Sequence, residues 1–334
     1  MLRPKPFALG VGSIPLILVL LAGLLNAHNI APAFSSNPSL TRKAEFLRTR
    51  MDTCELVVLG SSTALNNLDS GLLEKLTGYG AINLGYWGAA PSETLLMFRE
   101  LARGCTPKVA VLPVQFYDFY AAWNNEETPR DFFRYVRNDS PLRLVELYVS
   151  RLLPTLSEQV TRHDVVFRDP ARYESLAFNA NGDVLLACKG FHYDPARWDG
   201  FRKVRLADLR GERIQQELAA FRKLLELAKS KGTRVFVLRT PMTARAEREL
   251  ARPDVSIVLR NVKRYSRESG AQFVFVRNDD GTFGDELFSD YSHLNGCGAE
   301  RLTRVLANRI IAVGLGSPRR EAVAAREVRG VNSR

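Results

Sequence analysis

Two stretches far apart in the chain carry residues that together could perform acyl transfer. Ser62 follows the apolar run 55–59 and Gly60, so its hydroxyl lies just past a predicted strand, where open α/β sheets bind ligands. Asp290 and His293 lie three residues apart on a predicted loop. This spacing lets the carboxylate accept a hydrogen bond from one imidazole nitrogen, while the other nitrogen takes a proton from a serine. We therefore predict a nucleophile, Ser62, a general base, His293, and an orienting acid, Asp290. The alternative is a serine that only caps the next helix.

A glycine-containing turn after the second predicted strand could complete this site. It runs from Asn83 to Pro91 and contains Gly88, whose N–H can approach a substrate oxygen closely because glycine has no side chain. Together with the N–H of Ser62 it would form an oxyanion hole, in which each donor is typically worth about 10²–10³ in rate. An ordinary strand-to-helix turn is the alternative interpretation.

These residues must be positioned by a sheet, and the hydrophobic pattern predicts one. Strand-like and helix-like runs alternate, which is typical of a mostly parallel sheet with helices on both faces. The predicted strands are 55–59, 81–84, 109–114, 234–238 and 272–276, and the predicted helices include 68–76, 92–103, 212–229, 246–269 (broken near Pro253) and 299–313.

One region interrupts the alternation. Residues 117–209 are long, aromatic and irregular, whereas ordinary connections take only a few residues. We predict an insertion after the third strand, with helices around 142–153. It could act as a lid or substrate platform at the carboxyl end of that strand, or form an ornamental subdomain with its own small core.

The N-terminus predicts a membrane anchor. Residues 7–26 contain no charged side chain and are about as long as a bilayer crossing requires. Arg3 and Lys5 precede them, which favours a cytoplasmic N-terminus. We predict a single-pass protein of the inner (cytoplasmic) membrane with its catalytic domain on the periplasmic or extracellular side; a cleaved signal peptide is the alternative. The predicted parts are an anchor (1–30), a linker and lead-in (31–51), the α/β domain (52–316) and a basic tail (317–334).

Four cysteines fit an exported compartment. Cys54 and Cys105 each precede a predicted strand, so they would meet at one end of the sheet and could form a disulfide. Cys188 and Cys297 could form a second pair, although nothing local supports it, and four free thiols are the alternative. The cysteines and histidines lack metal-ligand spacing, so we predict no metal and no other cofactor.

Composition excludes two other classes of protein. A mean hydropathy of −0.14 excludes a polytopic membrane protein. The net charge of +11 could indicate a nucleic-acid binder, but the basic residues are mixed with acids along predicted helices and do not form a stripe. We predict no nucleic-acid partner.

The motifs resemble those of the SGNH/GDSL hydrolase superfamily. Gly60-Ser61-Ser62, the turn from Asn83 to Gly88, and Asp290-x-x-His293 followed by Leu and Asn are similar to its first, second and fifth sequence blocks. The nearest resemblance is to membrane-anchored relatives with a Gly-Ser-Ser first block, including acyl-transfer proteins of cell-envelope polymer modification. It covers 56–114 and 234–313. It implies a flavodoxin-like three-layer α/β/α domain with a five-stranded sheet, the triad named above, and the N–H groups of Ser62 and Gly88 as oxyanion donors.

The sequence departs from that family in its third block. Many members place an asparagine oxyanion donor there, whereas this chain has Gln115, which we predict to be the replacement donor. Asn83, Tyr86 and Trp87 in the second block are predicted to contact the substrate.

The resulting hypothesis is an exported serine esterase or O-acyltransferase. Its substrate would be an acylated, most simply acetylated, envelope or extracellular glycan, or a small ester, and a membrane acyltransferase is a candidate partner. The rival hypothesis is a non-catalytic envelope scaffold or accessory protein on the same fold. The sequence does not determine the oligomeric state.

Overall fold

The computed structural model describes nine stretches of the chain: residues 6–34, 38–49, 54–119, 128–138, 140–161, 175–190, 211–251, 253–278 and 280–315. The chain divides into two compact units. The first comprises 1–51 and 124–164, and the second comprises 52–123 and 165–334.

The second unit is built on a five-stranded sheet in the order β2-β1-β3-β4-β5, and every neighbouring pair is parallel. Val57 of β1 pairs with Ile82 of β2 on one side and with Ala110 of β3 on the other. This strand order is the flavodoxin-like one, in which the chain reverses direction beside the first strand and leaves a crevice at the carboxyl ends. The predicted parallel sheet is confirmed. Its strands are β1 (Leu56–Val58), β2 (Ala81–Asn83), β3 (Val109–Val114), β4 (Arg234–Arg239) and β5 (Gln272–Phe275).

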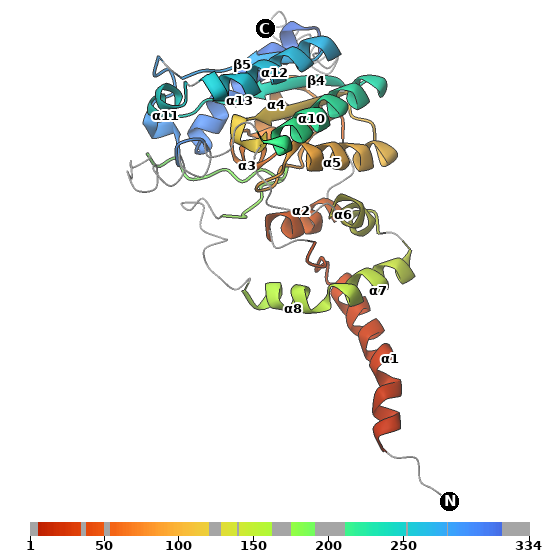
Figure 1. The fold of residues 1–334 in the computed structure, drawn as a ribbon. Helices are drawn as coiled ribbons and strands as arrows, with labels where there is room; N and C mark the ends of the chain where they lie inside the picture. The colour runs from red at the N-terminus through yellow and green to blue at the C-terminus, as the bar shows by residue number, and fades with distance from the viewer. Residues whose placement is uncertain are drawn as a thin grey trace, which may run out of the picture. The chain divides into compact units, whose positions relative to one another are not determined.

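Helices cover both faces of this sheet (Figure 1). Helices α4 and α13 contact each other and supply the helical side of one core cluster, whereas α10 contacts both α5 and α12 in a separate layer. The predicted break at Pro253 is confirmed, because it separates α11 from α12. The helices of this unit are α3 (Ser62–Asn66), α4 (Ser70–Thr77), α5 (Pro91–Gly104), α10 (Glu212–Ser230), α11 (Ala244–Glu249), α12 (Pro253–Ser269) and α13 (Gly296–Ala312), with short 3₁₀ turns η1 (Phe116–Phe119) and η3 (Asp285–Leu287).

The core under α13 shows how the sequence pattern creates this layer. Leu302, Leu306 and Ile310 recur at helical spacing and are fully buried. They belong to the same cluster as Leu56 and Val58, which point to one face of β1 because alternate strand residues share a face. Burying a side chain of this size contributes roughly 1.5–3 kcal/mol. Helix α13, which directly follows His293, is thus firmly attached to the sheet.

The first unit contains α1 (Pro6–Ala27), α2 (Pro38–Arg48), α6 (Thr128–Val136), α7 (Pro141–Ser150) and α8 (Leu152–Thr161). Helix α2 contacts α6, and α1 contacts α7. Within the predicted linker at 31–51, Ala31 and Phe34 are buried. Just before it, the Ile30 carbonyl accepts a hydrogen bond from the Tyr148 hydroxyl at 2.7 Å. The predicted insertion 117–209 is divided between the two units. Residues 124–164 belong to the first unit, and the described stretch 175–190 belongs to the second.

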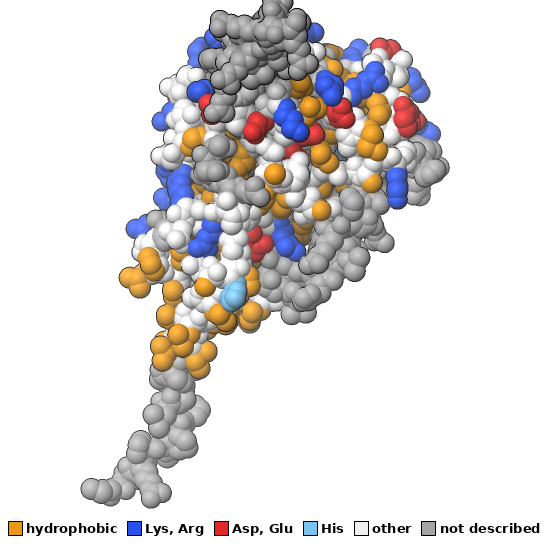
Figure 2. All heavy atoms as spheres, turned by 180° about the vertical axis from the view of Figure 1, so that it is seen from behind, with side chains coloured by type: hydrophobic (Ala, Val, Ile, Leu, Met, Phe, Trp, Pro, Cys, Tyr) orange, Lys and Arg blue, Asp and Glu red, His pale blue; other side chains and the backbone are white. Residues whose placement is uncertain are grey.

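Helix α1 forms where the anchor was predicted, and it exposes Leu16, Ile17 and Leu20. Figure 2 shows hydrophobic side chains gathered along its described part. Across the stretches that the structure describes, no helix combines the length and hydropathy needed to cross a membrane. The structure therefore does not support the transmembrane part of the prediction. The predicted tail at 317–334 lies outside the described residues.

Two disulfides join separate parts of the sheet unit. Cys54 pairs with Cys105 at a Cα–Cα distance of 6.4 Å, and Cys188 pairs with Cys297 at 5.5 Å. The first links the residues that precede β1 and β3, as the sequence predicted. The second attaches the 175–190 stretch to the first turn of α13.

Replacing both Cys54 and Cys105 by alanine should lower the free energy of unfolding. The bond closes a loop with a sequence separation of 51, and the chain entropy restored to the unfolded state corresponds to about 4 kcal/mol. Urea denaturation of oxidised wild type and the double variant measures this difference. Equal unfolding midpoints and slopes, with the bond verified by non-reducing peptide mapping, would contradict the expectation.

Candidate active site

The turn after β1 presents Ser62 at the carboxyl edge of the sheet. Gly60 has a φ of +144°, a region that L side chains rarely adopt, and a Cβ there would lie 3.1 Å from the Pro113 carbonyl oxygen. Ser61 follows as the N-cap, its side chain accepting a hydrogen bond from the Thr63 N–H. Ser62 is therefore the first residue of α3. Ser61 therefore caps the helix, whereas Ser62 is presented at the edge of the sheet; its role as a nucleophile stays a prediction.

Ser62, His293 and Asp290 form one hydrogen-bonded line. The Oγ of Ser62 lies 2.8 Å from Nε2 of His293. On the other side of the ring, Nδ1 lies 2.8 Å from Oδ2 and 3.0 Å from Oδ1 of Asp290. The structure thus brings together the three residues that the sequence singled out, in the order that the predicted roles require.

The charge of Asp290 fixes the direction of these bonds. Burial raises the pKa of its carboxyl group. The electrostatic interaction with His293 and the hydrogen bonds from the ring and from two backbone N–H groups lower this pKa by more, so that it lies at about 2. The carboxylate is therefore ionised at neutral pH and can only accept hydrogen bonds. Nδ1 must carry a proton to donate to it, which leaves Nε2 of the neutral imidazole as the acceptor for the Ser62 hydroxyl.

The loop that carries His293 is held by its backbone. Asp290 accepts hydrogen bonds from the N–H groups of Ser292 and His293, both at 2.8 Å. The N–H of Thr243, in the connection after β4, donates to the Tyr291 carbonyl at 3.0 Å. The carboxylate thus orients its own loop as well as the imidazole ring.

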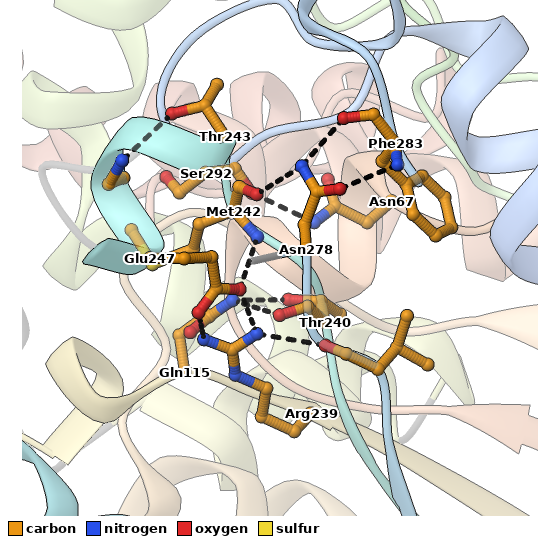
Figure 3. Close-up of polar contacts among 12 residues, drawn as sticks. Asn67, Gln115, Arg239, Thr240, Met242, Thr243, Glu247, Asn278, Phe283 and Ser292 are labelled. Carbon is orange, nitrogen blue, oxygen red and sulfur yellow. Dashed lines mark hydrogen bonds and ion pairs between the residues drawn. The ribbon is translucent and has the colours of Figure 1, made fainter. Parts of the chain in front are cut away.

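A buried polar network supports that connection after β4 (Figure 3). Asn278 donates to the carbonyls of Met242 and Phe283 at 3.0 and 2.6 Å. Glu247 accepts from the Met242 N–H at 3.2 Å and pairs with the guanidinium of Arg239. Because buried polar groups are costly unless they are paired, this network favours one conformation of the segment that holds Tyr291.

The predicted oxyanion turn lies against the nucleophile turn. The Tyr86 N–H donates to the Gly60 carbonyl at 3.2 Å. Gly85 packs so closely on α3 that a Cβ there would lie 2.7 Å from the Cβ of Ala64. Gly88 has a φ of +70°, which favours glycine at that position. The role of Gly88 as a donor stays a prediction.

Gln115 is placed differently from its predicted role. Its side-chain amide donates to both the carbonyl oxygen and the hydroxyl of Thr240, at 2.5 and 2.9 Å. Both amide hydrogens are therefore used to join the ends of β3 and β4. In this structure Gln115 connects strands, and its prediction as an oxyanion donor is not supported.

Two of the three predicted substrate contacts are part of the interior. Asn83 is fully buried, and its amide donates to the Ala64 carbonyl at 2.6 Å and to Asp183 at 2.7 Å. Tyr86 is 1% exposed, and burial raises the pKa of its hydroxyl well above the ordinary value. Only Trp87, which is half-buried against a small apolar cluster, retains surface that a substrate could touch.

Asp183 is a buried residue of the site that the sequence pattern did not indicate. It accepts hydrogen bonds from the backbone and hydroxyl of Ser70 and from the side chains of Asn83 and Asn179. Its stretch also donates from the Val184 N–H to the Leu65 carbonyl at 3.0 Å, so it supports α3 from the side. The one local signal was Asn181-Gly182-Asp183, which predicts a turn but not its partners. No group of three potential metal ligands occurs within the described part of the chain.

Comparison with known proteins gives distant structural matches only. No protein-family model matches the chain, and no curated protein matches it significantly. Among solved structures it is similar to TesA (14% identity, TM-score 0.39, covering 76% of this chain and 97% of that chain). It is also similar to a GDSL-like lipase from Bacteroides thetaiotaomicron (13% identity, TM-score 0.36, covering 78% and 89%). At such low identity and TM-score neither match establishes a function, which must be inferred from the geometry of the site.

A buried acid supports the turn that contains Gly88. Glu93, 5% exposed, accepts a hydrogen bond from the Ala90 N–H at 2.9 Å. Burial raises the pKa of its carboxyl group to about 7, and the nearby charge of Glu217 adds to that increase. In the unfolded chain this carboxyl group loses its proton near pH 4.5. Between pH 4.5 and about 7, the folded protein therefore still binds a proton that the unfolded chain has already released.

The stability of the wild type should therefore fall as pH rises from about 4.5 to 7 because of Glu93. Glu93→Gln keeps an acceptor for the Ala90 N–H but cannot ionise. Its free energy of unfolding, relative to wild type, should increase over this range by at most about 3 kcal/mol and then stay level. Urea titrations of both proteins from pH 4 to 8 measure the difference. A pH-independent difference would contradict the assignment.

Proposed function

We propose that this protein is a serine esterase. The observation that supports this proposal best is the chain of hydrogen bonds from Ser62 through His293 to Asp290. The hydrogen bonds on the two sides of the imidazole are both 2.8 Å long. A serine that only capped a helix would not need an imidazole nitrogen within hydrogen-bond reach of its hydroxyl, nor an ionised acid on the far side of that ring.

The proposed reaction uses these groups in two steps. Ser62 Oγ attacks the ester carbonyl while Nε2 of His293 takes its proton, and the N–H groups of Ser62 and Gly88 stabilise the oxyanion. Nε2 then gives the proton to the departing alcohol, which leaves an acyl group on Ser62. A water molecule then attacks the acyl carbon while the same nitrogen takes its proton. The bond between this carbon and Ser62 Oγ breaks, the proton passes from Nε2 to Oγ, and the acid is released. If a sugar hydroxyl replaces water, the same intermediate gives O-acyl transfer.

The acyl group is proposed to be short, such as acetyl, carried on a glycan of the cell envelope or on a small ester. The exposed face of Trp87 is the proposed contact for the sugar, and a membrane acyltransferase remains a candidate partner.

One observation favours the rival function, a non-catalytic scaffold. The amide of Gln115, at the position where the related motif places an oxyanion donor, is fully engaged by Thr240. The site would then rely on backbone donors alone. The intact triad geometry is the reason to prefer the esterase.

Labelling with a fluorophosphonate probe distinguishes the two functions. Wild type should become labelled at Ser62 and should hydrolyse p-nitrophenyl acetate. Ser62→Ala and His293→Ala should each lose on the order of 10⁴–10⁶-fold in kcat. Ser61→Ala is the matched control, because this serine lies in the same turn and its hydroxyl contacts Thr63; it should still be labelled. Wild-type labelling no stronger than that of Ser62→Ala would exclude the esterase.

We also propose that the protein is exported and held at the inner membrane by its first unit. Two disulfides support an oxidising compartment. Exposed leucines on α1, α7 and α8 support contact with lipid; they are Leu16, Leu20, Leu24, Leu142, Leu153 and Leu156.

Cell fractionation tests this location. The native protein should sediment with inner membranes, resist extraction by alkaline carbonate and be released by detergent. Its cysteines should resist alkylation until a reductant is added. Recovery in the soluble cytoplasmic fraction with all four thiols alkylated would contradict both export and attachment.

A further inference from the structure

We infer that Asn67 is a positioning residue for His293, acting through the backbone on both sides of that histidine. Its Nδ2 donates to the Ser292 carbonyl at 3.1 Å, and its Oδ1 accepts from the Leu294 N–H at 2.9 Å. Asn67 is fully buried and Ser292 is 2% exposed, so water does not compete for these bonds. Figure 3 shows Asn67 and Ser292 within the buried network beside the connection after β4.

Asn67 ends the same short helix, α3, that begins with Ser62. Ser62 is the first residue of this short helix and Asn67 is its C-cap, whose N–H donates to the Thr63 carbonyl at 3.1 Å. A single helical segment therefore presents the hydroxyl at one end and holds the histidine loop at the other. Any tilt of that loop relative to α3 would change the separation of Ser62 Oγ and His293 Nε2, so Asn67 fixes the distance over which the proton must move.

The chemistry of the position requires an amide. One side chain must supply a donor to Ser292 and an acceptor to Leu294, and the planar amide of asparagine carries both on adjacent atoms. An aspartate of the same shape would keep the bond to Leu294 but place a negative oxygen against the Ser292 carbonyl. Alanine would leave both backbone groups buried without this partner. The bonds made by Asp290 and Thr243 hold other atoms of the loop, so they do not replace those of Asn67.

The neighbouring Asn66 supplies a matched control. It is equally buried in the same helix, and its amide donates to the Val184 carbonyl at 2.9 Å. Its bond thus leads to the 175–190 stretch and not to the histidine loop. A merely structural role for Asn67 would make alanine substitutions at the two positions equivalent in activity once stability is matched.

The experiment compares Asn67→Ala, Asn67→Asp and Asn66→Ala in p-nitrophenyl acetate hydrolysis, at a temperature where all are folded. This readout rests on the proposed esterase function. Both Asn67 variants should lose about 10–100-fold in kcat with KM within about threefold of wild type, because a misplaced reacting group affects the chemical step. Asn66→Ala should stay within about threefold of wild-type kcat. Equal kcat losses at positions 66 and 67 would overturn the inference.

A second readout does not require turnover. The hydrogen-bonded Nδ1 proton of His293 should give a downfield NMR resonance, assigned by its absence in His293→Ala. This resonance should shift or broaden in Asn67→Ala and remain in Asn66→Ala; an unchanged resonance in Asn67→Ala would count against the inference. If wild type neither reacts with the probe nor hydrolyses ester, the proposed function fails, and the resonance still decides whether Asn67 positions the ring.

Discussion

The hydrogen bond between Ser62 and His293 joins residues 231 positions apart in the chain, and the sheet unit is arranged around it. Neither partner is held by this bond alone, because a single hydrogen bond contributes only about 0.5–1.5 kcal/mol net. Each side chain is instead presented by a segment that other contacts have already fixed. Gly60 and the Ser61 cap define the start of α3, and packing against β1 fixes α13 directly after the histidine loop.

The parallel sheet makes this meeting possible. Its strand order places β1 between β2 and β3, so the turns after three neighbouring strands converge at one edge. Contacts across that edge then join them: Tyr86 to Gly60 between the first two turns, and Gln115 to Thr240 farther along. The fold brings the segments within a few ångströms, and these polar contacts set the remaining geometry.

The sequence predicted the parts of the site that have a local signal. Apolar runs indicated the strands, Gly60 marked the sharp turn, and the three-residue spacing indicated that Asp290 faces His293. It did not predict Asn67, whose partners lie 225 and 227 residues away, because a buried asparagine in an apolar stretch does not identify what it binds. Asp183 was overlooked for the same reason. Asn83 was interpreted wrongly because a polar residue at a strand end can face either a substrate or the interior, and only packing decides.

The placement of Gln115 has a consequence for the chemistry of this site. Reversing its amide would point a carbonyl oxygen at the Thr240 carbonyl, so the fold fixes the donor side toward Thr240. Its Oε1 is buried and has no hydrogen-bond partner among the described residues. The free-energy cost of that unpaired oxygen must be offset by the hydrogen bonds between Gln115 and Thr240. In the proposed esterase, an oxyanion hole without a side-chain donor from Gln115 would support a rate about 10²–10³ lower than one with that donor. Catalysis would then depend more strongly on the backbone donors, whose turns Gly60, Tyr86 and Glu93 hold in place.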